Sequence, residues 1–221
     1  MRAVKTGLRD FVVCGLAISL VLFCSVALTA LGIRPATTVF LAEYHVIADF
    51  FAGLALYGVI SAIVLRAALA IRRVPAGEYG MDSPVFGYWK LLTILHRLGQ
   101  AALLPLTPIF ARPWLARLFG ARIGANVALG GSIDDPYMVS IGDDCVLGNN
   151  SLVAGSAIAG GRITLGPVSI GNRATVGVNA VVLPGTAIGD DAFVVGGSIV
   201  LPGTTVPNGE TWRGNPARKW Q

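Results

Sequence analysis

The sequence predicts a mainly β protein, in which a left-handed parallel β-helix of about five coils follows a two-helix transmembrane hairpin and interfacial helices. Three observations predict this fold. Aliphatic residues recur with a six-residue spacing after residue 122, and two long apolar runs precede residue 72. The segment between the second apolar run and the repeat mixes aromatic and basic residues. The chain has 221 residues, of which 54% are hydrophobic and 13% charged. It is therefore more apolar than an ordinary soluble domain.

The six-residue repeat is the strongest pattern in the chain. An aliphatic residue every six positions can point to the axis of a triangular coil with three faces, and a small residue four positions later fits where the chain turns a corner. A helical period cannot keep such residues on one face. The aliphatic set is Ile123, Leu129, Ile141, Leu147, Val153, Ile170, Val176, Val182, Ile188, Val194, Val200 and Val206. The small set is Cys145, Ser151, Ala157, Ala174, Ala180, Thr186, Ala192, Ser198 and Thr204.

Residues 123–221 are the predicted β-helix domain with its C-terminal tail. Two segments of this domain interrupt the repeat. The spacing from Val153 to Ile170 is 17 rather than a multiple of six, and residues 154–162 between them are rich in glycine. We expect a loop or a distorted coil there. Asp135 occupies a position where an aliphatic residue would fall, so the first coil is also expected to be irregular.

Residues 1–74 predict a membrane hairpin with spans at about 11–31 and 45–71. The first run contains no charge over 21 residues, which is enough for a spanning helix. The second contains Asp49 and Arg66 near its ends, from where both can reach the interface. A cleavable signal peptide is the competing interpretation because Arg2, Lys5 and Arg9 precede the first run. The length of that run and the second apolar stretch favour the hairpin.

Positive charges predict the orientation of this hairpin. Three basic residues precede the first span and Arg72 and Arg73 follow the second, whereas the connection holds only Arg34, with Glu43 nearby. The positive-inside rule therefore puts the N-terminus and the β-helix on the cytosolic side of the inner membrane. The predicted protein is multi-pass and has membrane lipids among its partners.

Residues 75–122 predict a linker and interfacial amphipathic helices. Aromatic residues such as Trp89 and Trp114 alternate with Lys90, Arg97, Arg112 and Arg117, which suits helices lying at a membrane surface. Three prolines argue against one continuous span. A helical collar packed on the β-helix is the alternative, and both descriptions can hold for different faces.

Charge and cysteine content narrow the function classes. Residues 1–122 carry a net charge of +7 and residues 123–221 a net charge of −2, so the basic character lies beside the apolar runs. This indicates anionic lipid head groups rather than nucleic acid, for which no binding motif is present. Cys14, Cys24 and Cys145 form no CxxC pair and are expected to be buried apolar filler.

Two stretches carry a family resemblance. Residues 176–185 (VGVNAVVLPG) and 212–218 (WRGNPAR) resemble the hexapeptide acyltransferases, including the galactoside and maltose O-acetyltransferases and polysaccharide-modifying enzymes. The apolar runs followed by residues 113–124 (PWLARLFGARIG) resemble the C-terminal membrane-linked domain of some nonribosomal peptide synthetases. A γ-type carbonic anhydrase shares the fold but needs three histidine ligands, and this chain has two histidines, so no metal is expected.

The resemblance implies a homotrimer with active sites between neighbouring copies, and acetyl-CoA or another acyl-CoA as co-substrate. Backbone amides would hold the pantetheine arm and fixed positive charges would meet the phosphates. A solvated tail is the alternative for the basic residues. The residues implied are Gly177, Gly196, Gly197 and Ser198 for the pantetheine arm, and Arg213, Arg218 and Lys219 for the phosphates.

The acceptor side falls on residues 133–144 by the same resemblance. Asp134 or Asp135 would bind the acceptor, although an Asp-Pro pair also forms turns. Asn149 and Asn150 would lie near the cleft or cap a corner.

The family's histidine base belongs in the loop where this chain has Gly155-Ser156-Ala157, and no histidine follows His96. Ser156 is therefore a catalytic candidate that needs help from another base, such as an aspartate or His96 of a neighbouring copy.

Two functions follow. The first is transfer of an acyl group, with acetyl favoured, from CoA to a hydroxyl or amine of a saccharide, lipid-linked or peptide acceptor. The second is a catalytically inactive trimeric scaffold at the membrane.

Overall fold

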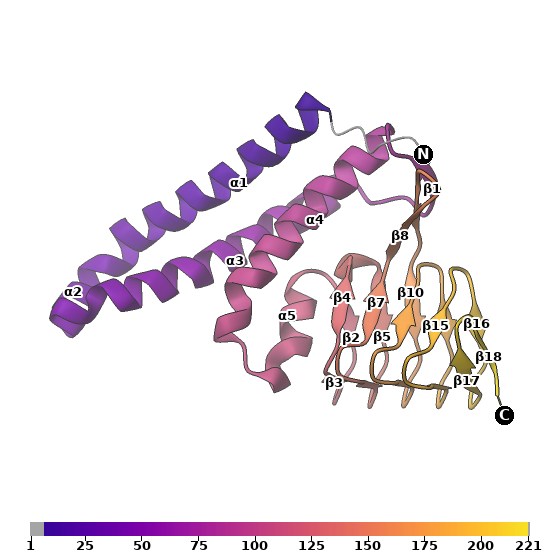
Figure 1. Ribbon diagram of the computed structural model, residues 1–221. Coiled ribbons are helices and arrows are strands. Elements are labelled where there is room, and N and C mark those ends of the chain that lie inside the picture. Colours follow the sequence, from indigo (N-terminus) through magenta and orange to yellow (C-terminus); the bar gives the residue numbers. More distant parts are fainter. Residues whose placement is uncertain (1–6, 221) are drawn as a thin grey trace. The chain divides into compact units, whose positions relative to one another are not determined.

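The computed structural model describes residues 7–220 and is mainly β after residue 120 (Figure 1). Arg2 and Lys5, on which the predicted orientation partly depends, lie outside the described residues. The chain divides into two compact units. One contains residues 75–86 and the β-helix from residue 109 onward, and the other contains the helices of residues 7–74 and 87–108.

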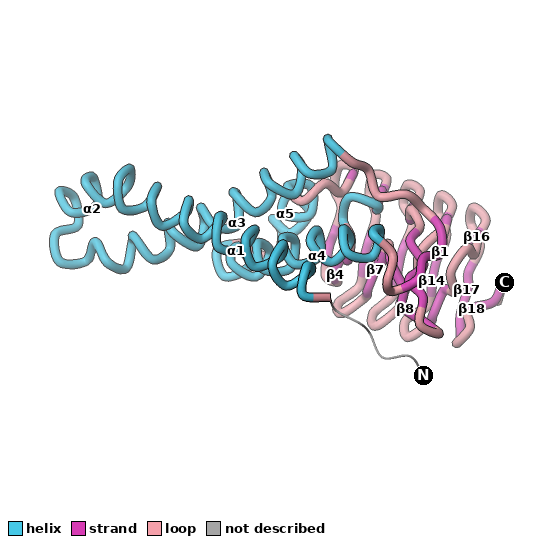
Figure 2. Tube along the Cα trace, turned by 90° about the horizontal axis from the view of Figure 1, so that it is seen from above, coloured by secondary structure: helices cyan, strands magenta, loops and turns pink. Residues whose placement is uncertain are grey.

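The β-helix has three sheets, one on each face of the coil, and their strands are parallel except in the C-terminal hairpin (Figure 2). The first four coils each supply one strand to every sheet and the fifth supplies strands to two of them, so the prediction of about five coils is confirmed. One sheet contains β2 (Arg122–Ile123), β5 (Val139–Ile141), β10 (Val168–Ile170), β13 (Ala187–Ile188) and β16 (Thr205–Val206). The second contains β3 (Ala128–Leu129), β6 (Val146–Leu147), β11 (Thr175–Val176), β14 (Phe193–Val194), β17 (Thr211–Gly214) and β18 (Ala217–Lys219). The third contains β4 (Ser132–Asp134), β7 (Leu152–Ala154), β12 (Val181–Val182) and β15 (Ile199–Val200).

The core of the β-helix is the predicted aliphatic set. Every member of that set is buried, as are the small residues of the regular coils from Ala174 to Ser198. The first coil departs from the period because Ile133, rather than residue 135, points inward and pairs with Val153. The strand therefore ends two residues early, and the chain turns at Asp135 into the 3-10 turn η5 (Pro136–Met138).

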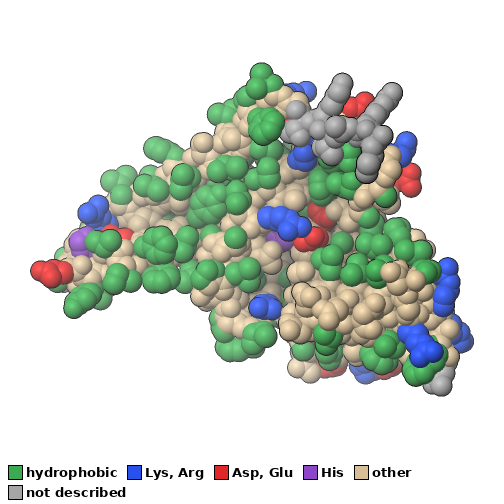
Figure 3. All heavy atoms as spheres, viewed as in Figure 1, with side chains coloured by type: hydrophobic (Ala, Val, Ile, Leu, Met, Phe, Trp, Pro, Cys, Tyr) green, Lys and Arg blue, Asp and Glu red, His purple; other side chains and the backbone are tan. Residues whose placement is uncertain are grey.

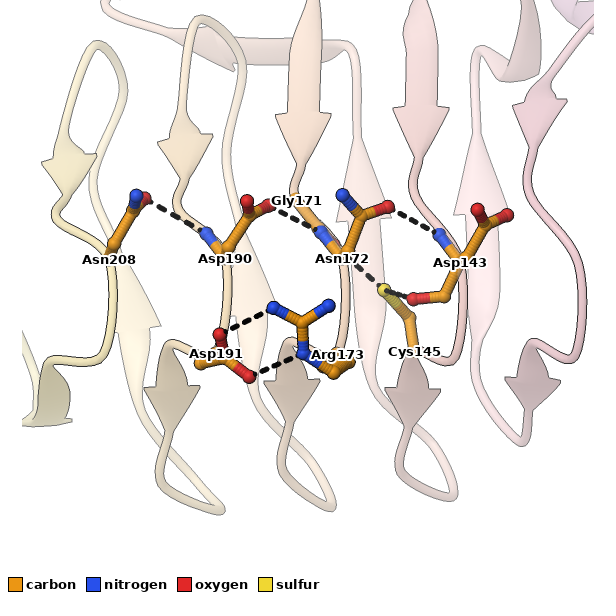
Figure 4. Close-up of polar contacts among 8 residues, drawn as sticks. All are labelled: Asp143, Cys145, Gly171, Asn172, Arg173, Asp190, Asp191 and Asn208. Carbon is orange, nitrogen blue, oxygen red and sulfur yellow. Dashed lines mark hydrogen bonds and ion pairs between the residues drawn. The ribbon is translucent and has the colours of Figure 1, made fainter.

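One corner of the β-helix carries a ladder of Asx side chains (Figure 4). In each link, a side-chain oxygen accepts a hydrogen bond from a backbone N–H of the preceding coil. Asp143 accepts from Ala125 at 2.6 Å, Asn172 from Asp143 at 2.9 Å, Asp190 from Asn172 at 2.7 Å and Asn208 from Asp190 at 3.0 Å. The ladder requires glycine beside it, because a Cβ at Gly171 would contact the Asp190 carboxylate and lie 2.7 Å from its backbone nitrogen. Gly124, Gly142 and Gly189 face the same constraint.

The glycine-rich interruption is an antiparallel hairpin rather than an irregular loop. Strands β8 (Ser156–Ala159) and β9 (Arg162–Leu165) pair across a turn at Gly160 and Gly161, which both have positive φ. A strand from the linker, β1 (Gly77–Gly80), pairs with β9 and completes a three-stranded sheet. Because β1 comes from more than 80 residues earlier in the sequence, no local pattern predicts this partnership.

A short helix closes the first coil. Helix α5 (Arg112–Leu118) follows the turns η3 (Leu104–Leu106) and η4 (Ile109–Ala111) and contacts β2 and β3. Arg112 donates to the Gly130 carbonyl at 3.3 Å, and Arg117 donates to the Ile123 carbonyl at 2.9 Å. This part of the predicted interfacial segment is therefore a collar on the β-helix.

The helical unit contains a long apolar segment. Residues Leu8–Ile71 are helical and long and apolar enough, by length and composition, to cross a membrane. They comprise α1 (Leu8–Leu28), the π-helix η1 (Thr29–Ile33), α2 (Arg34–Leu41), the 3-10 turn η2 (Ala42–Tyr44) and α3 (His45–Ile71). Helices α1 and α3 pack together (Figure 1), and Asp49 accepts from the Thr37 hydroxyl at 2.6 Å near the bend.

The outer surface of this segment is apolar (Figure 3). Large side chains such as Phe11, Leu16, Phe23, Phe40 and Phe51 are exposed, whereas a soluble helix would bury them. Helix α4 (Pro84–Leu103) follows the linker and supplies most of the other helical residues of this unit.

We expect Gly171→Ala to destabilise the β-helix. The added methyl group would force apart two coils whose backbones are already in contact, an overpacking cost of about 1–3 kcal/mol. Equilibrium unfolding in detergent measures the change. Ser169→Ala, at an exposed position on the adjoining strand, is the control and should leave the free energy of unfolding within about 0.5 kcal/mol. Equal stability of the two variants would contradict the requirement for glycine.

Candidate active site

The turn after β4 brings a buried carboxylate into the first coil. Asp135 is 4% exposed and has φ 55°, in the left-handed region that aspartate tolerates. Its carbonyl accepts from the Met138 N–H at 2.8 Å, and its Oδ1 accepts from the Tyr137 hydroxyl at 3.1 Å. Asp135 and Tyr137 therefore fix the shape of this turn.

The second interruption of the repeat lies against this turn. The Gly155 N–H donates to the Asp134 carbonyl at 3.2 Å. A Cβ on Gly155 would lie 3.1 Å from the Asp135 Cβ and 2.8 Å from the Met138 Cβ. The structure thus brings together the two irregular segments, Asp134–Tyr137 and Gly155–Ser156, which are separated by about a full coil of sequence.

The predicted catalytic side chains differ in accessibility. Asp134 follows Ile133, whose side chain points to the core, so alternation along the strand directs Asp134 outward, where it is half-buried. Ser156, at the start of β8, is also half-buried. Asp135 is covered by the protein. A ligand at this surface would therefore meet Asp134 and Ser156 first.

The two asparagines near this region act at a corner. Asn150 has φ 57° and its Nδ2 donates to Asn179 Oδ1 of the next coil at 2.7 Å. The Asn149 carbonyl accepts from the Asn179 N–H at 3.1 Å. These contacts show that the two asparagines cap a corner, which is one of the two roles expected for them.

The predicted pantetheine amides take part in the β-helix itself. The N–H groups of Gly177 and Gly197 donate to the carbonyls of Val194 and Val178, each at 2.8 Å, and the Ser198 N–H donates to Val195 at 3.2 Å. The Ser198 hydroxyl is buried and accepts from the Gly214 N–H at 3.1 Å. Gly196, next in this corner, is exposed. Contact of the Gly177, Gly197 and Ser198 amides with a ligand stays a prediction. Each N–H group would have to donate to the ligand and to its backbone carbonyl at the same time.

The C-terminal hairpin gathers the predicted basic residues. Arg213 and Arg218 lie opposite one another on β17 and β18, so their side chains share one face. The Arg213 guanidinium lies over the Trp220 ring, 4.3 Å from its centroid. Lys219 lies opposite Trp212 in the neighbouring cross-strand pair, and its Nζ contacts Glu210 Oε1 at 2.7 Å. Arg213 and Arg218 are exposed, so this face presents two guanidinium groups next to an indole.

Glu210 ties the hairpin to the last coil. The Lys219 ammonium and the Trp212 indole N–H both donate to its carboxylate, and these two hydrogen bonds hold the pKa of Glu210 below its ordinary value. Lys219 is consequently less available to an external phosphate than the two arginines.

His96 lies within α4 and is 4% exposed. Burial disfavours the imidazolium, with a further contribution from Arg97, and lowers the pKa of His96 to about 4. A histidine of such low pKa is a weak general base. Among residues 7–220, no group of three histidine, cysteine, aspartate or glutamate side chains is arranged to hold a metal ion.

The cysteines differ in surroundings but all are free thiols. Cys145 is fully buried at a small-residue position of the repeat, and its thiol donates to the Gly171 carbonyl at 2.9 Å. Burial raises the pKa of this thiol.

Sequence reasoning missed two partners at the site. Tyr137 stands two residues after Asp135, a spacing that a turn closes, and Trp220 is the last aromatic residue of the tail. Nothing in the local sequence distinguishes either from a solvent-exposed aromatic residue, because both acquire their partners through turns.

A family model described as the hexapeptide repeat of succinyl-transferase matches residues 138–160 and 167–202. Both matched segments lie within the β-helix. The gap between the two matched segments falls in the β8–β9 hairpin, where the coil is interrupted. The matched repeats are the ones that the six-residue spacing predicts.

The chain is similar to a curated protein, the delta-poly-L-ornithine synthetase of Acinetobacter baumannii strain AB307-0294. The two are 26% identical over 151 residues, which is 67% of this chain and 11% of the relative. The chain thus spans about a tenth of that relative's length.

Among solved structures, three acetyltransferases are similar to this chain. A galactoside acetyltransferase in complex with coenzyme A is 23% identical, covers 57% of this chain and 80% of its own, and has a TM-score of 0.47. A hexapeptide-repeat acetyltransferase of Vibrio cholerae is 18% identical, with coverage of 57% and 89% and a TM-score of 0.46. A maltose O-acetyltransferase of Clostridium difficile 630 is 19% identical, with coverage of 71% and 95% and a TM-score of 0.44.

The Glu210 contacts predict a pH dependence. Because the folded-state pKa of Glu210 is depressed, its contribution to stability is present above the unfolded pKa of about 4.5 and is lost as the pH falls through the lower folded value. Glu210→Gln should therefore be less stable than the wild type at pH 7. The difference should shrink below pH 4.5, as measured by thermal unfolding followed by tryptophan fluorescence. A difference that is the same at pH 7 and pH 3 would contradict the assignment.

Proposed function

We propose that the chain is a membrane-anchored acyltransferase that moves an acyl group, with acetyl favoured, from CoA to an acceptor with a nucleophilic amine or hydroxyl. One observation carries the proposal: Asp134 lies beside the Gly155–Ser156 loop, although the two come from different coils. The acceptor class is a saccharide, a lipid-linked molecule or a peptide.

The reaction at such a site is an addition followed by elimination. The acceptor nitrogen or oxygen attacks the thioester carbonyl carbon, the C–S bond breaks, and CoA leaves as the thiolate. The proton released by the acceptor goes to the Asp134 carboxylate, which passes it to the thiolate, and the Ser156 hydroxyl at the start of β8 relays or orients it. Asp135 acts through Tyr137 to hold the turn and is a positioning residue.

The missing histidine favours an amine acceptor over a hydroxyl. An alcohol is a weak nucleophile that needs a strong base during attack. An unprotonated amine attacks unaided, and the ammonium formed on the tetrahedral carbon gives up its proton to a weak base such as a carboxylate. The name of the curated relative, a synthetase of delta-poly-L-ornithine, is consistent with an amine substrate.

The coenzyme would be held at the C-terminal end of the β-helix. The paired Arg213 and Arg218 suit the phosphates of acyl-CoA, and Trp220 offers a flat surface for the adenine. Gly177, Gly196, Gly197 and Ser198 would line the pantetheine arm, and Lys219 would add long-range positive charge. A homotrimer would supply the cleft by placing one copy's coils beside the next.

The helical hairpin would anchor the protein in the inner membrane. The exposed apolar surface of α1 and α3 supports contact with membrane lipids, and the basic residues at both ends of the hairpin favour a β-helix on the cytosolic side, where acyl-CoA is made. Nucleic acid is not among the proposed partners.

Arg218→Ala should weaken acetyl-CoA binding by about tenfold or more, because a charge-assisted hydrogen bond to phosphate is removed. Titration calorimetry on the detergent-purified full chain measures the dissociation constant. Arg173→Ala is the matched control. It removes the same charge from an exposed arginine that pairs with Asp191 at 2.8 Å on a coil corner, and it should leave affinity unchanged. Equal losses in the two variants would contradict the assignment of Arg218.

Asp134→Asn should lower acyl transfer by about a hundredfold or more while acetyl-CoA binding is retained, because the amide cannot accept the proton. The assay follows transfer of a radiolabelled acetyl group from acetyl-CoA to a panel of small primary amines that includes L-ornithine. Asp143→Asn is the control, since an asparagine oxygen can keep the Asx ladder intact, and it should be as active as the wild type. Unchanged transfer in Asp134→Asn would exclude this carboxylate as the base.

A catalytically inactive trimeric scaffold is the second candidate function. The burial of Asp135 and the absence of histidine after residue 96 favour it. A wild-type chain that fails to bind acetyl-CoA at millimolar concentration, while remaining folded, would favour the scaffold over the enzyme.

A further inference from the structure

A groove lies within the helical unit, between α1 and α4. It has a volume of about 340 Å³ and is lined almost entirely by apolar atoms. A Cβ built on Gly15 would have no atom within 4 Å, so the space in front of this glycine is open. Its apolar wall consists of Phe11, Cys14, Gly15, Ile18, Trp89 and Ile94.

The groove has one charged end. Asp10, near the start of α1, forms an ion pair with Lys90 of α4, and both side chains are largely buried. The Asp10 carboxylate also accepts from the Gly7 N–H at 3.3 Å.

The polarity changes along the groove. Asp10, Cys14 and Ile18 follow one another at successive turns of α1, and Lys90 and Ile94 do the same on α4. The groove therefore runs from a charged end to an apolar end. The span from residue 10 to residue 18 is about 12 Å at the rise of an α-helix.

From this arrangement we propose that the groove binds one acyl chain of a membrane glycerophospholipid, with the head group at the Asp10–Lys90 end. The inference rests on the proposed membrane anchoring, because the lipid reaches the groove from the bilayer. A water-soluble metabolite does not fit this lining, which offers polar groups only at its charged end and at Thr93, whose buried hydroxyl has no hydrogen-bond partner among the described residues.

The surroundings favour a lipid over a segment of another protein. Phe11 and Leu16, on and beside the groove, are 67% and 66% exposed, so the groove opens onto an apolar surface. In a bilayer that surface is covered by hydrocarbon chains, and one of them can enter the groove and bury its methylenes against Gly15. The Asp10–Lys90 ion pair at the groove end offers one carboxylate and one ammonium, which suit the amine and the phosphate of a zwitterionic head group.

The test uses the full-length chain purified in detergent from its host membranes and analysed by native mass spectrometry. One glycerophospholipid should remain bound per chain. Gly15→Phe fills the open space without a clash and replaces a poor helix former, so it should fold and lower lipid occupancy by about tenfold or more. Leu16→Phe, at the neighbouring position outside the groove wall, is the matched control and should retain the lipid.

A second readout localises the chain. After reconstitution into nanodiscs of phosphatidylethanolamine and phosphatidylglycerol that carry a diazirine on one acyl chain, irradiation should label Cys14 and Ile94 in the wild type and in Leu16→Phe. Labelling of these residues should be lost in Gly15→Phe. Retention of lipid and labelling in Gly15→Phe, or recovery of an isoprenoid-linked molecule in place of a phospholipid, would overturn the proposal.

Carbonate extraction of host membranes separates this outcome from failure of the anchor. A chain that resists extraction but binds no lipid leaves the membrane proposal intact and refutes the groove. A chain released by carbonate refutes both.

Discussion

The structure depends on how closely successive coils of the β-helix approach one another. Neighbouring parallel strands lie about 4.8 Å apart, and at the corners the backbones of two coils come into direct contact. At Gly171 a single methyl group would meet the backbone and carboxylate of Asp190 in the next coil. Glycine is therefore required there, and Asn172, the residue after it, uses its side-chain oxygen to accept a hydrogen bond from the backbone N–H of Asp143 in the preceding coil. The aliphatic core is in register because these corners are.

This constraint also explains where a site can form. In regular coils the amides and carbonyls are committed to the neighbouring coil, as the bonds of Gly177 and Gly197 illustrate. Side chains that could act on a ligand accumulate where the coil is broken. The turn at Asp135 and the β8–β9 hairpin are both breaks, and the close approach of Gly155 to Asp135 places them at one surface. The β-helix also ends at its last coil, where the β17–β18 hairpin exposes the paired Arg213 and Arg218.

The sequence predicts the β-helix well because its physics is local and periodic. Each buried aliphatic residue from Ile170 to Val206 follows from the six-residue spacing alone. The inward position of Ile133 in the first coil does not follow from the spacing. The aspartate at position 135 shows only that the six-residue period fails there. The partnership of β1 with β9 depends on strands far apart in sequence and so leaves no local signal. For the site, the two breaks are visible in the sequence, whereas the burial of Asp135 and its contact with Tyr137 depend on how the turn closes. The collar role of α5 likewise depends on tertiary contacts that an amphipathic pattern does not distinguish from membrane contacts.

In the proposed enzyme, the thioester reacts at the break in the β-helix formed by Asp134 and Ser156. The most direct measurement is an experimental structure of the full-length chain with acetyl-CoA bound, in detergent or nanodiscs. We expect the sulfur of the coenzyme within reach of Asp134 and Ser156 and its phosphates against Arg213 and Arg218. A coenzyme whose sulfur lies away from both Asp134 and Ser156, or a β-helix that stays empty at millimolar acetyl-CoA, would contradict the claim.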